Sequence, residues 1–347
     1  EEIFGGEIGY LPWQRPGIDL GIKLGRMAEE NPALVGVVLG SHGLFTWGAT
    51  AKQSYEQTLR IINKAAVWLD ANVKKPVFGG AATATLAPQE RAAVARRLMP
   101  LIRGRISKSE MKAGHFTDAP AVLEFVNSNA LTALAPLGTS CPDHFLRTKI
   151  KPLVVPADAD GEALDGLIEG YRAEYAAYYD RCKHPDSPPL RDPNAVVYLV
   201  PGVGMITFAK DKATARISGE FYVNAINVMR GASTVSDYCG LPEQEAFDIE
   251  YWLLEEAKLQ RMPKPKALAG RVAFVTGGAG GIGSATAERF LQEGACVMLA
   301  DIDATALEAV KANLASRFGA DMVRVVQMDV TDEAQVTAAY VQTALAF

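Results

Sequence analysis

The sequence has few cysteines, no long apolar run and no excess of positive charge, and each shortage argues against a class of protein. No apolar stretch reaches the roughly 18 residues that a membrane-spanning helix needs, and no secretory signal pattern opens the chain. Its four cysteines include no C-x-x-C pair, as expected of reduced thiols in a cytoplasmic protein. A formal net charge of −5 argues against a nucleic acid partner bound through its phosphates.

What remains is an ordinary globular composition. Hydrophobic residues make up 49% and charged residues 22% of the 347 positions, which predicts two or three domains with sizeable cores. The chain starts Glu1-Glu2 without Met and ends inside a recognisable pattern, so we expect a fragment of a longer protein.

The most informative stretch runs from Arg271 to Asp301 and predicts a strand, a glycine loop, a helix and a second strand. Residues 272–276 and 296–300 have the near-continuous apolar character of strands buried on both faces. The loop between them allows a dinucleotide pyrophosphate to approach the backbone N–H groups of a helix N-terminus. Side chains would block that approach, which explains glycine at three positions, Gly277, Gly281 and Gly283.

Asp301 lies 18 residues after Gly283 (301 − 283), close to the spacing of the acid that accepts from the adenosine ribose hydroxyls. Its negative charge would repel a 2′-phosphate and therefore favours NAD over NADP. The alternative is a plain glycine-rich turn. The strand–loop–helix–strand context and the acid together favour the nucleotide site.

The loop reads T-G-x-x-x-G-I-G, from Thr276 and Gly277 to Gly281, Ile282 and Gly283, and here residues 268–347 resemble the short-chain dehydrogenase/reductase family. A third strand is expected at 323–328, and the resemblance implies adenine contacts from the pair that follows it, Asp329 and Val330. A helix is expected between the second and third strands, with one apolar stripe: Leu307, Val310, Leu314 and Phe318.

The family's catalytic Asn, Ser and Tyr-x-x-x-Lys normally follow this stretch, and none of them is found before Phe347. Tyr340 is followed four residues later by Ala344 and not by Lys. Tyr179 and Lys183 have the right spacing but precede the loop, so we interpret them as coincidence. The dehydrogenase catalytic residues are therefore unknown.

Near the amino end the expected order is a loop at 10–17, a helix at 20–28, two strands at 35–39 and 44–47, and a long helix. The strands are joined by a tight turn, Gly40-Ser41-His42-Gly43. Apolar residues alternate by four and three along the long helix, which predicts one buried stripe: Tyr55, Leu59, Ile62, Ala66 and Leu69.

A lone histidine such as His42 is most often a hydrogen-bonded structural residue. The pattern around it, however, resembles the class II aldolase/adducin family, in which the resemblance implies that His42 is a ligand of zinc or another divalent metal. The family takes its other histidine ligands from an upstream His-x-His, and residues 1–41 contain no histidine. Because these ligands and the dehydrogenase catalytic set are missing, we expect the isolated chain to have neither activity.

The middle of the chain leaves several alternatives open. The basic residues between 91 and 112 form either a phosphate-binding patch or a solvated helix face. Cys141 and His144 could share a metal, or Asp143, His144, Arg147 and Lys149 could line an anion site. The run 138–149 resembles the central part of bifunctional proteins that join a rhamnulose-phosphate-type aldolase to a short-chain dehydrogenase.

Residues 196–229 repeat the layout of two strands, a tight turn and a long helix. Gly204 falls 161 residues after Gly43 (204 − 43), Thr207 matches Thr46 at the same offset, and Val203 takes the place of His42. The hypothesis is a degenerate second copy of the aldolase half-motif without its metal ligand. The alternative is an unrelated hairpin and helix.

A charged helix is expected at 243–260, with Phe247, Tyr251 and Leu254 on one side. Residues 263–267, rich in proline and lysine, form an extended linker. The predicted fold class is α/β: a class II aldolase-like region at 1–262, followed at 268–347 by the first half of a Rossmann doubly wound parallel sheet of short-chain dehydrogenase type.

The resemblance implies a bifunctional parent protein. Its aldolase would cleave a sugar phosphate such as rhamnulose 1-phosphate, and its dehydrogenase would oxidise or reduce an alcohol or aldehyde with NAD. One alternative is a sugar-alcohol dehydrogenase with an inactive aldolase-like scaffold, and another is a non-enzymatic, adducin-like interaction module. Expected partners are these small molecules and further copies of the chain in a homo-oligomer, with neither nucleic acid nor membrane.

Overall fold

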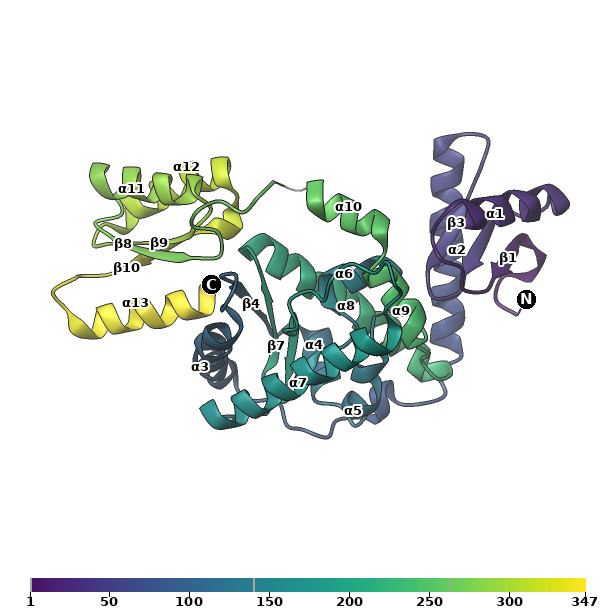
Figure 1. The fold of residues 1–347 in the computed structure, drawn as a ribbon, viewed down its shortest axis with the longest axis horizontal. Coiled ribbons are helices and arrows are strands. Elements are labelled where there is room, and N and C mark those ends of the chain that lie inside the picture. The colour runs from purple at the N-terminus through teal and green to yellow at the C-terminus, as the bar shows by residue number, and fades with distance from the viewer. Residues whose placement is uncertain (1, 140, 262) are drawn as a thin grey trace.

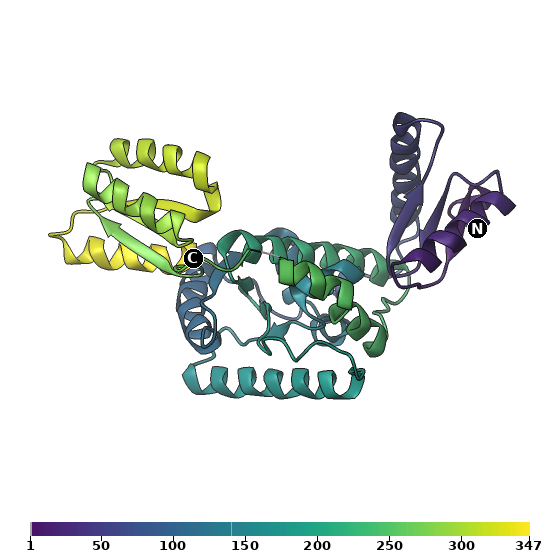
Figure 2. The ribbon, with the colours of Figure 1, turned by 45° about the horizontal axis from the view of Figure 1, so that its top comes forward.

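The computed structural model describes residues 2–139, 141–261 and 263–347, which form three regions (Figure 1). The amino-terminal region (residues 2–72) stands to one side of a larger middle region (residues 73–261). The carboxyl-terminal region (residues 268–347) packs on the opposite side of the middle region, as both views show (Figures 1 and 2). Among the described residues, no helix has the length and apolar character needed to cross a bilayer.

The amino-terminal region is a three-stranded sheet with one helix on each face. The strand order is β1-β2-β3, with β1 parallel to β2 and β2 antiparallel to β3. The loop expected at 10–17 is wrong at its start, because the backbones of Tyr10 and Leu11 pair with β2. The elements are a 3-10 turn at Gly5–Glu7, β1 (Ile8–Leu11), α1 (Ile18–Glu30), β2 (Gly36–Leu39), β3 (Gly43–Thr46) and α2 (Ala51–Ala71).

The stripe expected to be buried on α2 is wrong as well. Tyr55, Leu59 and Ile62 are 64%, 49% and 54% exposed, whereas the fully buried residue of the helix is Ile61. The buried face is therefore rotated away from the predicted one. Within the described residues, three short strands cover only one narrow face of this long helix.

The middle region is a four-stranded sheet, β4-β7-β6-β5, between two helical layers. α3 and α7 pack on the face that carries Tyr198, Val200 and Phe208, and α4 and α8 pack on the other. Its helices are α3 (Pro88–Ile106), α4 (Pro120–Val126), α5 (Leu131–Leu134), α6 (Phe145–Thr148), α7 (Gly161–Cys182), α8 (Lys212–Val235), α9 (Glu243–Glu250) and α10 (Leu253–Arg261). Its strands are β4 (Ala113–Thr117), β5 (Leu153–Val154), β6 (Val197–Val200) and β7 (Gly204–Ala209), and 3-10 turns lie at Val77–Gly79, Ala135–Leu137 and Pro142–His144.

The middle region repeats the layout of the amino-terminal region. In both regions the first strand is followed by a helix and then by a second strand that is parallel to the first. The second and third strands form an antiparallel hairpin, and a long helix follows it. The element orders are β1-α1-β2-β3-α2 and β5-α7-β6-β7-α8. The hairpin registers are identical at the offset of 161 residues. Gly36 pairs with Thr46 in the first hairpin, and Val197 pairs with Thr207 in the second.

Side chains repeat at this offset too. The hydroxyl of Thr46 donates to the carbonyl of Ser54 at 3.2 Å, and that of Thr207 donates to the carbonyl of Ala215 at 2.7 Å. The predicted repetition of hairpin and helix is therefore confirmed at the level of individual hydrogen bonds.

The single helix expected at 243–260 is wrong, because α9 ends at Glu250 and α10 begins at Leu253. Tyr251 lies at the break, where its ring stacks on Phe247 and its hydroxyl lies 2.8 Å from that of Tyr175. Leu254, expected on the same side, is 58% exposed. Burial of Tyr251 fixes the backbone in a conformation that turns α10 away from α9.

The carboxyl-terminal region confirms the predicted strands and helices. Its sheet is entirely parallel, with the order β10-β9-β8. α11 and α12 cover one face through Val297 and Leu299, and α13 covers the other (Figure 1). The elements are β8 (Val272–Thr276), α11 (Gly281–Gln292), β9 (Cys296–Asp301), α12 (Ala304–Phe318), a 3-10 turn at Ala320–Met322, β10 (Val323–Gln327) and α13 (Glu333–Ala346).

Basic side chains of α3 bind other parts of the middle region, and one of them also binds the carboxyl-terminal region. Arg103 donates to the carbonyls of Lys112 and Gly270, the second of which belongs to the carboxyl-terminal region. Arg97 donates to carbonyls near the start of α7, and Arg105 pairs with Asp165 at 2.8 Å. Arg91, Arg97, Arg103 and Arg105 of α3 therefore bind backbone carbonyls or carboxylates within the chain, which neither of the two alternatives predicted.

His115 of β4 lies near this contact and should make stability depend on pH. Burial, and then the charge of Lys212, lower the pKa of His115 to about 4, against about 6.5 in an unfolded chain. The folded state therefore binds fewer protons, so the contribution is complete above about pH 6.5 and is lost as the pH falls toward 4. Between about pH 7.5 and about pH 5, urea unfolding should lose about 1–2 kcal/mol through this residue. His115→Gln should abolish that share, and an unchanged pH profile would contradict the assignment.

Candidate functional site

The loop between β8 and α11 is built so that glycine is required at two positions. Gly277 has a φ of +63°, in the left-handed region that favours glycine, and its carbonyl accepts from the N–H of Gly280 at 3.1 Å. A Cβ on Gly283 would lie 2.1 Å from the same carbonyl oxygen. Both glycines therefore let the loop fold tightly against the first turn of α11.

Gly281 differs from them. A Cβ placed there would meet nothing within 4 Å, so the chain itself does not require glycine at this position. Gly281 and Ile282 begin α11, whose first N–H groups have no intrahelical partners and carry the positive end of the helix dipole. Ile282 is 89% exposed, and Thr276 at the end of β8 is exposed as well. This face can accept an anion.

Asp301 lies at the end of β9, directly beside the loop. One carboxylate oxygen accepts from the N–H of Ala279 at 3.1 Å, and the other accepts from the N–H of Asp303 at 3.2 Å. The structure thus brings the predicted acid into contact with the predicted glycine loop.

Asp329 and Val330 follow β10, the next strand of the sheet. The N–H and hydroxyl of Thr331 donate to one oxygen of Asp329 at 2.8 and 2.7 Å, and these bonds lower the pKa of that carboxyl. Val330 is 60% exposed. Ile302, which was not predicted as a site residue, is 65% exposed. The available signal for Ile302 was an apolar residue directly after the strand-ending acid.

These groups fit the parts of a dinucleotide. The helix N-terminus suits a pyrophosphate, the carboxylate of Asp301 suits ribose hydroxyls, and exposed apolar side chains suit a flat base. The space above Gly281, which a Cβ would fill, is where a bound phosphate would approach the backbone. The residues present therefore fit NAD.

The two tyrosines considered for dehydrogenase catalysis lie elsewhere. Tyr340 stacks on Phe274 of β8, with ring centroids 4.6 Å apart. Tyr179 of α7 belongs to the middle region, where its hydroxyl donates to the carbonyl of Pro188 at 2.8 Å. Neither lies at the glycine loop.

His42 occupies the turn of the first hairpin, beside Ser41, whose φ is +53°. Its Nδ1 atom is buried and has no hydrogen-bond partner among the described residues. The ring of Trp13 lies 6.4 Å away, centroid to centroid. An orphaned ring nitrogen of this kind is available to a further ligand.

The described residues contain no group of three His, Cys, Asp or Glu side chains that could hold a metal. His42 therefore lacks partner ligands within the described part of the chain, which by itself does not fit a zinc site. His144 is buried, its Nδ1 is 3.0 Å from the hydroxyl of Thr139, and its ring packs on Phe221. Cys141 and His144 are not part of a group of three such ligands within the described ranges.

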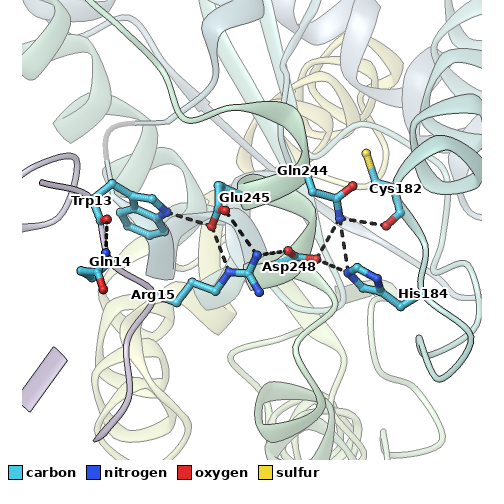
Figure 3. Close-up of polar contacts among 8 residues, drawn as sticks. All are labelled: Trp13, Gln14, Arg15, Cys182, His184, Gln244, Glu245 and Asp248. Carbon is cyan, nitrogen blue, oxygen red and sulfur yellow. Dashed lines mark hydrogen bonds and ion pairs between the residues drawn. The ribbon is translucent and has the colours of Figure 1, made fainter. Parts of the chain in front are cut away.

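A polar cluster fixes the loop beside His42 to the middle region (Figure 3). Trp13 Nε1 and Arg15 Nε both donate to Glu245 of α9 at 2.9 Å, and Arg15 also pairs with Asp248. His184 lies 2.7 Å from the other oxygen of Asp248. Sequence reasoning missed this cluster because its partners lie more than 200 positions apart.

The turn of the second hairpin is closed. Val203, in the place of His42, is fully buried in the main core of the middle region. The neighbouring Gly202 donates its N–H to Asn127 at 2.6 Å and accepts from the N–H of Leu86 at 3.0 Å. Of the two repeated turns, only the one with His42 offers a ligand atom.

Three stretches of the chain match known protein families. Residues 1–69 match the family described as "Class II Aldolase and Adducin N-terminal domain", residues 93–259 match "Aldolase class II, second domain", and residues 271–346 match "short chain dehydrogenase". The chain thus joins a class II aldolase/adducin region to a short-chain dehydrogenase region, in that order.

Individual relatives extend the comparison. The "Uncharacterized oxidoreductase YuxG" of Bacillus subtilis is 35% identical over 355 residues, an alignment that covers 100% of this chain and 51% of the relative. The chain therefore spans about half the length of that relative. A Sphingomonas "2-dehydro-3-deoxy-L-rhamnonate dehydrogenase (NAD(+))" is 44% identical over 78 residues, 22% of this chain and 29% of the relative.

Among solved structures, a short-chain dehydrogenase/reductase from Burkholderia phymatum in complex with NAD is 34% identical. The match covers 25% of this chain and 29% of that one, with a TM-score of 0.22.

Proposed function

We propose that the carboxyl-terminal region binds NAD and belongs to a protein that oxidises or reduces an alcohol or aldehyde. The observation that carries this is the contact of Asp301 with the glycine loop at Ala279. A carboxylate at this position accepts from two ribose hydroxyls and repels the 2′-phosphate of NADP. The match to the short-chain dehydrogenase family supports the same reaction class.

Asp301→Asn tests the cofactor preference. Asn retains an oxygen for the Ala279 N–H but loses the charge and one acceptor. We expect NADH affinity to fall about tenfold, the effect of about 1.4 kcal/mol, and NADPH affinity to fall less or to rise. Fluorescence titration of the chain with both cofactors measures the ratio.

Asp303→Asn is the matched control, because Asp303 caps α12 by accepting from the N–H of Ala306 at 2.9 Å, and Asn caps equally well. It should leave both affinities unchanged. A wild-type chain that prefers NADPH would overturn the assignment of Asp301.

For the amino-terminal and middle regions, we propose the ancestry of a class II sugar-phosphate aldolase, acting on a substrate such as rhamnulose 1-phosphate in the parent protein. The family matches and the orphaned Nδ1 of His42 support this. His42 would serve a divalent metal only together with ligands from outside the described residues.

A second candidate is a dehydrogenase with an aldolase-like scaffold, which the lack of a three-ligand group among the described residues favours. Elemental analysis of the longer parent protein separates the two. Stoichiometric zinc that is lost in His42→Ala supports the aldolase. Absence of bound zinc supports the scaffold.

A further inference from the structure

A cavity of about 460 Å³ opens in the middle region at the end of the second hairpin opposite its turn. It is walled by the residues just before β6, the end of β7, the first turns of α8, the residues around α6, and α10. Figure 1 shows α6, α8 and α10 on the same side of the middle region. The cavity is therefore separate from both the glycine loop and the turn with His42.

The lining carries more positive than negative charge. Six cationic side chains face three carboxylates, a formal excess of three (6 − 3). Three cations are already neutralised, since Lys112 pairs with Glu110 and Asp192, Lys258 pairs with Glu255, and Arg191 pairs with Glu256 outside the lining. Arg147 and Lys210 have no carboxylate partner among the described residues. The six cations are Lys112, Arg147, Lys149, Arg191, Lys210 and Lys258.

Lys149 is held in an uncommon conformation in the same wall. Its φ is +58°, in the left-handed region that non-glycine residues rarely adopt. The ammonium donates to the carbonyl of Asp192 and lies 3.8 Å from the centre of the Tyr175 ring. An ammonium has three donors, and the described residues supply one acceptor, so donor capacity remains for a ligand.

Strained residues that neighbouring contacts hold in place are frequent at binding sites. The anion site considered from the sequence also included Asp143, whose side chain lies outside the described part of the structure, and His144, which is buried against Phe221 and does not line the cavity. Arg147 and Lys149 do line it, and Lys210, 61 residues further along the chain (210 − 149), joins them. The cations therefore come from separate elements and converge on one space.

We propose that this cavity binds a phosphate group, either free or on a small ester. Guanidinium and ammonium groups together recognise the compact charge of a phosphate. The volume suits a small phosphorylated molecule, and Thr214 and Ser218 line the cavity, so that their hydroxyl oxygens can accept from a hydroxyl of the ligand. α10 forms part of the wall and leads directly toward the linker at 263–267, so the bound anion lies close to the connection between the two regions.

Isothermal titration of the chain with inorganic phosphate, glycerol 3-phosphate and glycerol tests the site. We expect both anions to bind and glycerol not to bind. Arg147→Gln/Lys210→Gln should weaken both anions at least about tenfold, because each charge-assisted hydrogen bond contributes strongly to binding. These two side chains take part in no ion pair with described carboxylates, so the variant should fold normally.

The matched control is Arg26→Gln/Lys74→Gln, which removes the same charge from exposed positions outside the cavity. It should bind both anions as the wild type does. If the control weakened binding equally, the loss of affinity would come from net charge alone, and the proposed site would be wrong. It would also be wrong if the wild-type chain bound neither anion at millimolar concentration. Binding of phosphate without glycerol 3-phosphate would identify free anion, and the reverse would identify an ester.

Lys149→Met tests the site through the pH dependence of phosphate binding, which replacing a merely structural residue would not change. Burial lowers the pKa of Lys149 to about 8, with the carboxylates of Glu250 and Asp192 opposing the shift and Lys112 and Arg191 adding to it. Wild-type phosphate binding should weaken above about pH 8, since the ammonium loses its proton there while phosphate stays dianionic. In Lys149→Met this decline should disappear. An unchanged decline would exclude Lys149 from the site.

Discussion

Replacing Gly281 with Ala is expected to remove NAD binding from a chain that still folds. A Cβ at this position meets nothing within 4 Å, and Ala favours helix over Gly by about 1 kcal/mol, so stability should not fall. The same Cβ would occupy the space through which the pyrophosphate approaches the first N–H groups of α11. NADH affinity should fall about a hundredfold, the effect of about 2.7 kcal/mol.

Gly283→Ala is the contrasting variant, because its Cβ would lie 2.1 Å from the carbonyl oxygen and 2.7 Å from the carbonyl carbon of Gly277. Backbone atoms cannot rotate away, so the loop must shift, at a cost of about 2–4 kcal/mol. This variant should lose both stability and NADH binding, as measured by thermal unfolding and fluorescence titration. If Gly281→Ala binds NADH like the wild type, the N-terminus of α11 is not the pyrophosphate site.

The glycine loop could be predicted because everything that defines it is local. Two strands, one turn and one helix lie within about thirty residues, and the acid falls at a fixed distance from the last glycine. The structure adds only the partners of Asp301 and the exposed Ile302. Local patterning was also sufficient for β9, β10 and α12.

Contacts between distant segments could not be predicted in the same way. The alternation of apolar residues on α2 correctly indicated a helix, yet the buried side centres on Ile61, because the position of β3 decides which face is covered. Burial of Tyr251 against Phe247 and Tyr175 breaks a helix whose own sequence shows no breaker. Trp13 and Arg15 find Glu245 only after the regions have folded.

The internal repeat lies between these cases. The matching residues could be identified in the sequence, but the sequence did not show why they match. Thr46 and Thr207 match because each hydroxyl ties the second strand of its hairpin to the helix that follows. Asp211 takes the place of Thr50 (211 − 50 = 161) because either side chain can cap that helix. Hydrogen-bonding positions have kept their chemistry, whereas the two turns have diverged.

That divergence predicts opposite outcomes when the turn residues are exchanged. Val203→His should destabilise the protein by at least about 3 kcal/mol, because it places a larger, polar ring where Val203 is fully buried among apolar neighbours. His42→Val should change stability by less than about 1 kcal/mol. His42 is only half-buried, and its Nδ1 has no hydrogen-bond partner among the described residues, so no bond of that atom is lost. Urea unfolding of each variant measures the difference.

Val203→Thr separates polarity from size, because Thr introduces a hydroxyl at nearly constant volume. An intermediate loss of about 1–2 kcal/mol is expected for it. Equal losses for Val203→His and His42→Val would mean that the two turns are equally packed, and His42 would then be a structural residue like its counterpart. Unequal losses would leave His42 as a residue that stability alone does not require, which is the property expected of a group retained for a ligand.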